Sequence, residues 1–136
     1  MGLIEKRNTK KRVLAVDDTA IVLTRILNTL QEDYTVVTVN SGVRALKYLE
    51  QEKPDLILLD IQMPQKDGIE TLKEIRNMAG RADIPVIMLT GVEEKEIVLK
   101  SAKLGICDYI LKPFAPDVLL DRINRVFGQG KPYTLS

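Results

Sequence analysis

The segment Leu56-Ile57-Leu58-Leu59, followed at once by Asp60, decides the fold of this chain. Four consecutive aliphatic residues without apolar–polar alternation are typical of a strand buried on both faces of a parallel sheet. Three further segments share this character: Val13-Leu14-Ala15-Val16, Val86-Ile87-Met88-Leu89 and Tyr109-Ile110-Leu111. The segment 34–39 mixes threonine with valine, which better suits an edge strand. We therefore predict five strands.

Amphipathic segments separate the predicted strands. Apolar residues recur there at helical spacing, over residues 23–30, 45–49, 72–79 and 119–126, and more weakly over 93–103. Ser41 and Asp67 stand where helix N-caps belong, and Glu70 follows Asp67 at the spacing of a capping box. Strand and helix alternate five times, which predicts a doubly wound α/β domain with a five-stranded parallel sheet and helices on both faces.

The ends of the chain differ from its middle. We expect a basic amino-terminal arm over residues 1–10, one folded domain over 11–128, and a tail or the start of a linker over 129–136. Five basic residues against Glu5 give residues 1–12 a net charge of +4. Such an arm could contact nucleic acid or an anionic membrane. The simpler interpretation, which we adopt, is a solvated terminus that binds neither.

Composition narrows the available chemistry. The chain has no histidine, which excludes Ser-His and Cys-His nucleophiles and most catalytic zinc sites. Its single cysteine, Cys107, cannot form an internal disulfide, and we interpret it as a small core residue. No apolar run approaches the roughly 20 residues of a membrane span, so we expect a cytoplasmic protein. Carboxylates, hydroxyls and lysines remain, and these suit a hard cation such as Mg²⁺.

Polar residues follow the predicted strands at their carboxyl ends, where ligands bind in open parallel sheets. These residues are Asp17, Asp18, Asp60, Thr90 and Lys112. Each also has a simpler explanation on its own: Asp18 could cap the next helix, Asp60 could be a loop aspartate, and Lys112 could be a solvated lysine.

Taken together, the five residues indicate a phosphoryl-accepting site. Three clustered carboxylates repel one another, by about 4 kcal/mol for a pair at roughly 4 Å and an effective dielectric of about 20. A bound Mg²⁺ removes this conflict. The cation, Thr90 and Lys112 could then neutralise the phosphoryl oxygens, while Asp60 acts as the nucleophile.

Five motifs in this order resemble the receiver domain of bacterial response regulators, over about residues 11–127. They are Asp17-Asp18, Asp60-Ile61-Gln62-Met63-Pro64, Asp67-Gly68, Thr90-Gly91 and Tyr109-Ile110-Leu111-Lys112-Pro113-Phe114. The resemblance implies a CheY-like sheet of order 2-1-3-4-5 and phosphorylation of Asp60 by a histidine kinase or phosphotransfer protein, in a two-component system or phosphorelay. It also implies Mg²⁺, which Mn²⁺ can replace, bound by Asp18, Asp60 and the backbone carbonyl of Gln62, with Asp17 acting largely through water.

The resemblance further implies how the signal leaves the site. Thr90 and Tyr109 would switch the surface formed by the fourth helix, fifth strand and fifth helix. Asp108 and Arg122 resemble a salt-bridge pair of receiver dimers, whereas Val98 and Val118 occupy positions where a charged pair is usual. The sequence therefore leaves open whether the chain forms a homodimer through this interface. The signal would pass to a downstream protein or to a fused output domain.

Other interpretations stay open at this point. A haloacid-dehalogenase-like phosphohydrolase also uses a strand-end aspartate and Mg²⁺, but it normally has an acidic residue where this chain has Gln62. A flavodoxin-like module is disfavoured by the acidic, glycine-free segment 17–20. A receiver that has lost phosphate acceptance is a third alternative, although all reactive positions are present. We expect a non-enzyme whose phosphoryl lifetime depends on Gln62 and Val92.

Overall fold

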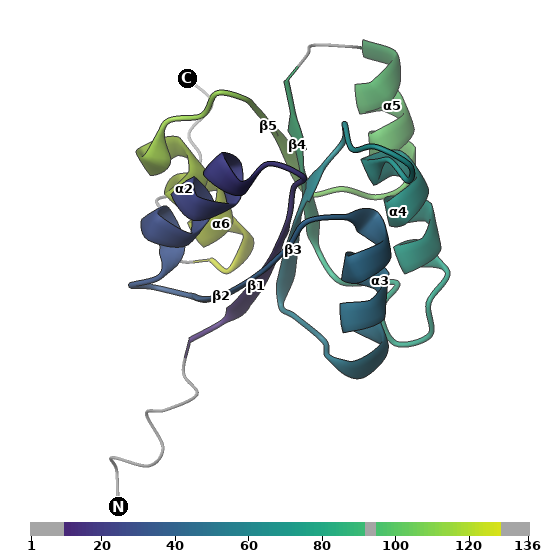
Figure 1. The fold of residues 1–136 in the computed structure, drawn as a ribbon, viewed down its shortest axis with the longest axis horizontal. Helices are drawn as coiled ribbons and strands as arrows, with labels where there is room; N and C mark the ends of the chain where they lie inside the picture. Colours follow the sequence, from purple (N-terminus) through teal and green to yellow (C-terminus); the bar gives the residue numbers. More distant parts are fainter. Residues whose placement is uncertain (1–9, 92–94, 129–136) are drawn as a thin grey trace, which may run out of the picture.

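Five parallel strands form one sheet with the order β2-β1-β3-β4-β5 (Figure 1). The computed structural model describes residues 10–91 and 95–128. Its strands are β1 (Arg12–Val16), β2 (Thr35–Val39), β3 (Leu56–Asp60), β4 (Val86–Thr90) and β5 (Asp108–Leu111). The predicted doubly wound fold and the strand order implied by the receiver resemblance are both confirmed.

Five helices in the described part of the chain cover the two faces of the sheet. They are α2 (Ala20–Leu30), α3 (Gly42–Gln51), α4 (Gly68–Arg76), α5 (Lys95–Lys103) and α6 (Pro116–Val126). Helices α2 and α6 lie on one face, and α3, α4 and α5 lie on the other (Figure 1). No helix in the described parts of the chain is long and apolar enough to cross a bilayer.

The two helical layers explain why the central strands are apolar throughout. In β1, Val13 and Ala15 pack into the core beneath α2 and α6, whereas Leu14 and Val16 pack into the core beneath α3 and α4. All four side chains are completely buried. Successive residues of a strand point to opposite faces, so a strand covered on both sides needs apolar residues at every position. Among the described residues, the half-buried β2 pairs only with β1, as predicted for an edge strand.

The predicted N-caps of α3 and α4 are confirmed. Ser41 Oγ accepts the backbone N–H of Arg44 at 3.1 Å. Asp67 Oδ1 accepts the N–H of Glu70 at 2.9 Å, and Glu70 Oε1 accepts the N–H of Asp67 at 3.2 Å, which completes the capping box. Two backbone donors that a helix leaves unpaired are thereby satisfied, and the start of α4 is fixed.

Two local expectations are wrong. Helix α4 ends at Arg76, with Asn77 as its C-cap, so Ala79 lies outside the helix and is exposed. Cys107 is also exposed, although its backbone N–H donates to Val86 O at 2.9 Å. It precedes β5 at the amino end of the sheet, where the two helical layers do not cover its side chain. Neither difference affects the carboxyl end of the sheet, where the candidate site lies.

Candidate functional site

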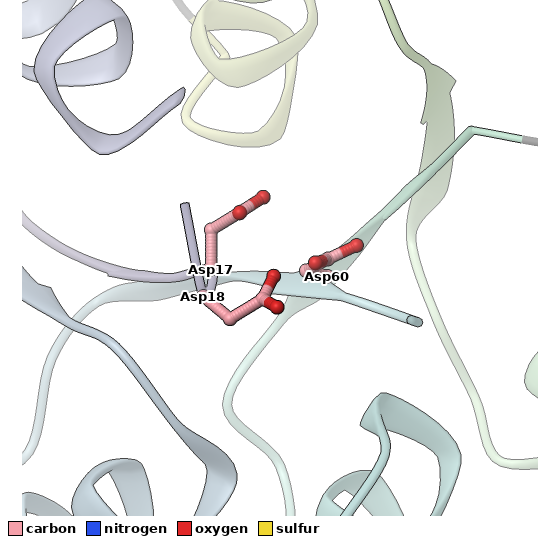
Figure 2. A group of neighbouring side chains, drawn as sticks. All are labelled: Asp17, Asp18 and Asp60. Atoms are coloured by element: carbon pink, nitrogen blue, oxygen red, sulfur yellow. The ribbon is translucent and has the colours of Figure 1, made fainter. Parts of the chain in front are cut away.

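Three carboxylates meet at the carboxyl ends of β1 and β3. The two strands pair with Val16 opposite Leu59, so Asp17 and Asp18 leave the sheet beside Asp60. One oxygen from each carboxylate lies within 4.8 Å of the others. Figure 2 shows the side chains of Asp17, Asp18 and Asp60 gathered at this edge, with the carboxylate of Asp18 turned toward Asp60. The predicted acidic cluster is therefore assembled by strand register alone.

Asp17 is completely buried, and both its oxygens are engaged within the chain. Its Oδ1 accepts the backbone N–H of Thr19 at 2.9 Å and the Thr19 hydroxyl at 2.5 Å. Its Oδ2 accepts Lys112 Nζ at 2.7 Å. Asp17 therefore fixes the loop after β1 and holds the lysine over the site.

Asp60 is buried but only partly hydrogen-bonded. It is 1% exposed, and its Oδ1 lies 3.1 Å from Lys112 Nζ and accepts the backbone N–H of Gln62 at 3.3 Å. Its Oδ2 is buried and has no hydrogen-bond partner within the described residues. Burial, followed by the negative charge of Asp17, raises the pKa of Asp60 from 3.8 to about 6, although Lys112 acts in the opposite direction.

The raised pKa of Asp60 should make the stability of the metal-free protein depend on pH. Folded Asp60 binds its proton more tightly than unfolded Asp60, so its contribution to stability is lost as the pH rises from 3.8 to about 6. The amide of an Asp60→Asn variant does not titrate. We expect this variant to gain stability relative to the natural chain across this interval, and to keep the gain at higher pH. Urea unfolding at a series of pH values in EDTA measures the difference, and a pH-independent difference would contradict it.

Asp18 is exposed, unlike its two neighbours. The N-cap of α2 is Thr19 and not Asp18, and the Thr19 side chain makes no capping hydrogen bond within the described residues. The alternative interpretation of Asp18 as a helix cap is therefore wrong. An exposed carboxylate within reach of two buried ones leaves an open side through which a ligand can approach.

Lys112 follows β5 and contacts two of the carboxylates, and Thr90 is the last residue of the neighbouring β4. Thr90 is 2% exposed, and its carbonyl accepts the backbone N–H of Lys112 at 2.7 Å. Burial alone would lower the pKa of Lys112, but the hydrogen bond to Asp17 and the charge of Asp60 raise it above its ordinary value. The ammonium group is thus held in its charged form between Asp17 and Asp60.

The signalling residues implied by the resemblance lie on one face of the sheet. Leu89 and Ile110 pack beneath α2 and α6, so their neighbours Thr90 and Tyr109 face the opposite layer. Tyr109 is 40% exposed and borders a surface hollow of about 480 Å³ between β5 and α6. The predicted switch pair therefore shares a face, with Tyr109 toward solvent.

The four residues predicted for an interface are placed differently. Asp108 and Arg122 form an ion pair within the chain, at 2.9 Å between Oδ2 and Nη1. Val118, on α6, is 40% exposed and lines the same surface hollow as these two residues. The backbone of Val98 belongs to α5, but its side chain lies outside the described residues, as does Val92 entirely.

Thr19 belongs to the site, although the sequence did not reveal it. Its N–H and hydroxyl both bind Asp17 Oδ1, so it orients the carboxylate that holds Lys112. The pattern Asp-x-Thr is the available signal, because a hydroxyl two residues after an aspartate can close a local turn onto it. That signal is common in loops, and it indicates a site only once the position after β1 is known.

The donor set fits a hard divalent cation. Three carboxylates within 4.8 Å of one another carry more negative charge than the ammonium of Lys112 balances. Oxygen ligands with an open side match the preference of Mg²⁺ for a few protein oxygens and retained waters. Fold and site together define a doubly wound α/β domain with an acidic, Mg²⁺-compatible site at its carboxyl edge.

Residues 13–124 match the response regulator receiver domain, and the chain belongs to that family. It is 38% identical over 122 residues to the alkaline phosphatase synthesis transcriptional regulatory protein PhoP of Bacillus subtilis, covering 89% of this chain and 50% of that protein. It is 42% identical over 120 residues to the probable transcriptional regulator ycf27 of Guillardia theta, covering 87% and 46%. The chain thus spans about half the length of these relatives.

Solved structures agree with this assignment. The chemotaxis protein CheY4 of Vibrio cholerae, crystallised at low pH, superposes with a TM-score of 0.83 at 32% identity, covering 87% of this chain and 99% of that one. DrrB of Thermotoga maritima, an OmpR/PhoB homologue, gives a TM-score of 0.79 at 30% identity, covering 94% of this chain and 58% of that one. The similarity therefore extends over most of this chain, and it covers almost all of CheY4.

Proposed function

We propose that this chain is the phosphoacceptor of a two-component system or phosphorelay, and that Asp60 is its phosphorylation site. The observation that carries the proposal is the state of Asp60 Oδ2, a buried carboxylate oxygen without a hydrogen-bond donor in the described chain, beside the ammonium of Lys112. That oxygen is the nucleophile. It attacks the phosphorus of a phosphohistidine in a donor protein, the P–N bond breaks, and the imidazole leaves with its electron pair.

Asp18, Asp60 and the backbone carbonyl of Gln62 would hold Mg²⁺, for which Mn²⁺ can substitute. When bound, the cation neutralises negative charge on the carboxylates and on the phosphoryl group. Asp17 contributes largely through water and through Lys112, because both its oxygens already accept hydrogen bonds. Support for this set comes from the 4.8 Å clustering of the three carboxylates.

Lys112 and Thr90 stabilise the product. The Lys112 ammonium, 3.1 Å from Asp60, pairs with one phosphoryl oxygen, and the Thr90 hydroxyl donates to another. The chain contains no histidine, so the donor imidazole belongs to a partner, either a histidine kinase or a phosphotransfer protein. Gln62 stands where a haloacid-dehalogenase-like phosphohydrolase keeps its general acid. We therefore infer that the chain is a switch that accepts one phosphoryl group and loses it slowly, and that it is not an enzyme with repeated turnover.

Domain and partner assignments follow from the same proposal. Residues 11–128 are the receiver, with the arm over 1–10 and the tail or linker over 129–136. The receiver acts in the cytoplasm and binds neither nucleic acid nor membrane. Its output is a downstream protein or a fused domain, and the regulators PhoP and ycf27, about twice as long as this chain, favour a fused domain. A homodimer through the β5–α6 surface is one form of output.

We expect the Tyr109 side chain to move on phosphorylation of Asp60. If Thr90 moves toward the phosphoryl group, Tyr109 on the same face turns inward. With fluorinated tyrosine, we expect acetyl phosphate and Mg²⁺ to shift the ¹⁹F signal of Tyr109 and to leave that of Tyr48 unchanged. In Thr90→Ala, phosphorylation persists but the Tyr109 shift is largely lost. An equal shift in Thr90→Ala would contradict the proposed coupling.

Stoichiometry tests the proposed function. The chain is incubated with acetyl phosphate, with and without Mg²⁺, and the protein mass and the released phosphate are followed together. We expect one phosphoryl group per chain, formed only with the cation and lost slowly. Rapid release of many phosphates per chain, or hydrolysis of ordinary phosphate esters, would instead support the phosphohydrolase.

A further inference from the structure

Two glycines at helix starts connect α3 to the phosphorylation site through close contacts. Gly42 is the first residue of α3, and Gly68 is the first residue of α4. Both are buried, and neither has the positive φ that by itself requires glycine. Their lack of a Cβ is therefore explained by space and not by backbone conformation.

Gly68 lies directly against the backbone of Asp60. A Cβ at Gly68 would lie 2.2 Å from Asp60 O and 2.7 Å from Ile61 Cα. The Gly68 N–H donates to Ile61 O at 2.8 Å, and Ile61 N–H donates to Leu89 O at 2.9 Å. The first turn of α4 is therefore in backbone contact with the nucleophile's own peptide, and the loop 61–67 is closed between them.

Gly42, at the start of α3, also lies close to the first turn of α4. A Cβ there would lie 2.1 Å from Thr71 Oγ1 and 3.3 Å from Lys66 O. Thr71 is completely buried, and its hydroxyl donates to Asp67 O at 2.8 Å. The first turn of α4 is thus held between the start of α3 and the backbone of Asp60. Packed interiors transmit such displacements, because there is no free volume to absorb them.

We propose that Gly42 is a positioning residue for Asp60 and for the loop 61–67, and that it acts through Thr71 and Gly68. Gly42 touches no reacting atom. Its missing side chain sets how close the first turn of α4 stands to α3, and hence, through Gly68, where the Gln62 carbonyl and the Asp60 carboxylate lie. This inference rests on the proposed function of Asp60.

A double-mutant cycle tests it. Gly42→Ala should displace the first turn of α4 and reduce the rate of phosphorylation by acetyl phosphate at least about tenfold, since sub-ångström to ångström misplacement of reacting groups is costly. Adding Thr71→Ala removes the clashing Oγ1 together with the γ-methyl group, and should restore most of the rate. Adding Thr71→Val instead replaces the hydroxyl by a methyl group and keeps the branched side chain. The clash then remains, so this change should not restore the rate. Non-additivity of this kind is expected of residues in contact.

Two further readouts separate positioning from stability. In the ¹H–¹⁵N spectrum of the Mg²⁺-free protein, Gly42→Ala should shift the amide signals of residues 60–68. Adding Thr71→Ala to this variant should reverse these shifts. Urea unfolding reports the stability of each variant. Shifts confined to α3, a wild-type rate in Gly42→Ala, or equal rescue by Thr71→Val would each overturn the inference.

Thr71→Ala alone covers the case in which Gly42→Ala fails to fold. It opens a gap beside Gly42 and should accelerate hydrogen exchange of the Gly68 amide, whereas unchanged exchange would overturn the inference. A natural chain that accepts no phosphoryl group overturns the proposed function and this inference with it. A natural chain that is phosphorylated, with a Gly42→Ala variant equal to it, overturns the inference alone.

Discussion

The Asp60→Asn variant is expected to accept no phosphoryl group from acetyl phosphate or from a phosphohistidine donor. Asparagine keeps the shape of the side chain and an acceptor for the Gln62 N–H, but an amide has no nucleophilic carboxylate oxygen at the position of Oδ2. The free energy of unfolding should not fall, since a buried charge is removed. Intact-protein mass spectrometry after incubation with Mg²⁺ and acetyl phosphate measures the loss.

Asp83→Asn is the matched control for this experiment. Asp83 is an exposed aspartate in the loop before β4, at the amino end of the sheet and away from the site. Its variant should be phosphorylated as fast and as fully as the natural chain. Phosphoryl uptake by Asp60→Asn at the natural level would mean that another residue is the acceptor.

Removal of the Lys112 charge has the second large expected effect. Lys112 Nζ is 2.7 Å from Asp17 Oδ2, and Asp17 is completely buried. Lys112→Met keeps the aliphatic stem but leaves two buried carboxylates without their cation. Breaking a buried pair on one side typically costs about 3 kcal/mol or more, and we expect a loss of that order in urea unfolding without metal. Mg²⁺ should restore part of it by binding the folded state.

The variant Lys112→Met/Asp17→Asn tests the cause of this loss. The added Asp17→Asn change takes away one of the two buried carboxylates that Lys112→Met leaves without a cation, so the double variant should be more stable than Lys112→Met alone. Both variants should be phosphorylated more slowly than the natural chain, because neither has an ammonium to pair with the phosphoryl group. Equal stability of Lys112→Met and the natural chain in EDTA would show that the ion pair contributes little.

The fold could be predicted from the sequence because each strand carries a strong local signal. The unbroken apolar runs, such as Leu56-Ile57-Leu58-Leu59, follow directly from burial on both faces. The capping pattern of Asp67 and Glu70 predicted the start of α4 for the same reason, since both partners are close in sequence. Ala79 was misplaced because an apolar residue at helical spacing does not show where the helix ends.

The positions of the site residues could also be predicted, because strand ends converge in a parallel sheet. Asp17, Asp18 and Asp60 needed only strand assignment and register. Their different environments could not be predicted: that Asp17 is sealed by Thr19 and Lys112, while Asp18 is exposed, depends on loop conformation. The contact of Gly42 with Thr71 was equally hidden, since it joins residues far apart in the sequence through the absence of a side chain.

Chemical trapping of the phosphorylated residue identifies the acceptor without relying on a variant. The chain is phosphorylated with acetyl phosphate and Mg²⁺ and then treated with borohydride, which reduces an aspartyl phosphate to homoserine with release of phosphate. Peptide mass spectrometry then locates the modified residue. We expect homoserine at position 60 alone, and none when Mg²⁺ is withheld. Homoserine at position 17 or 18, or no reduced residue in a chain that has taken up phosphate, would contradict the assignment of Asp60 as the phosphoacceptor.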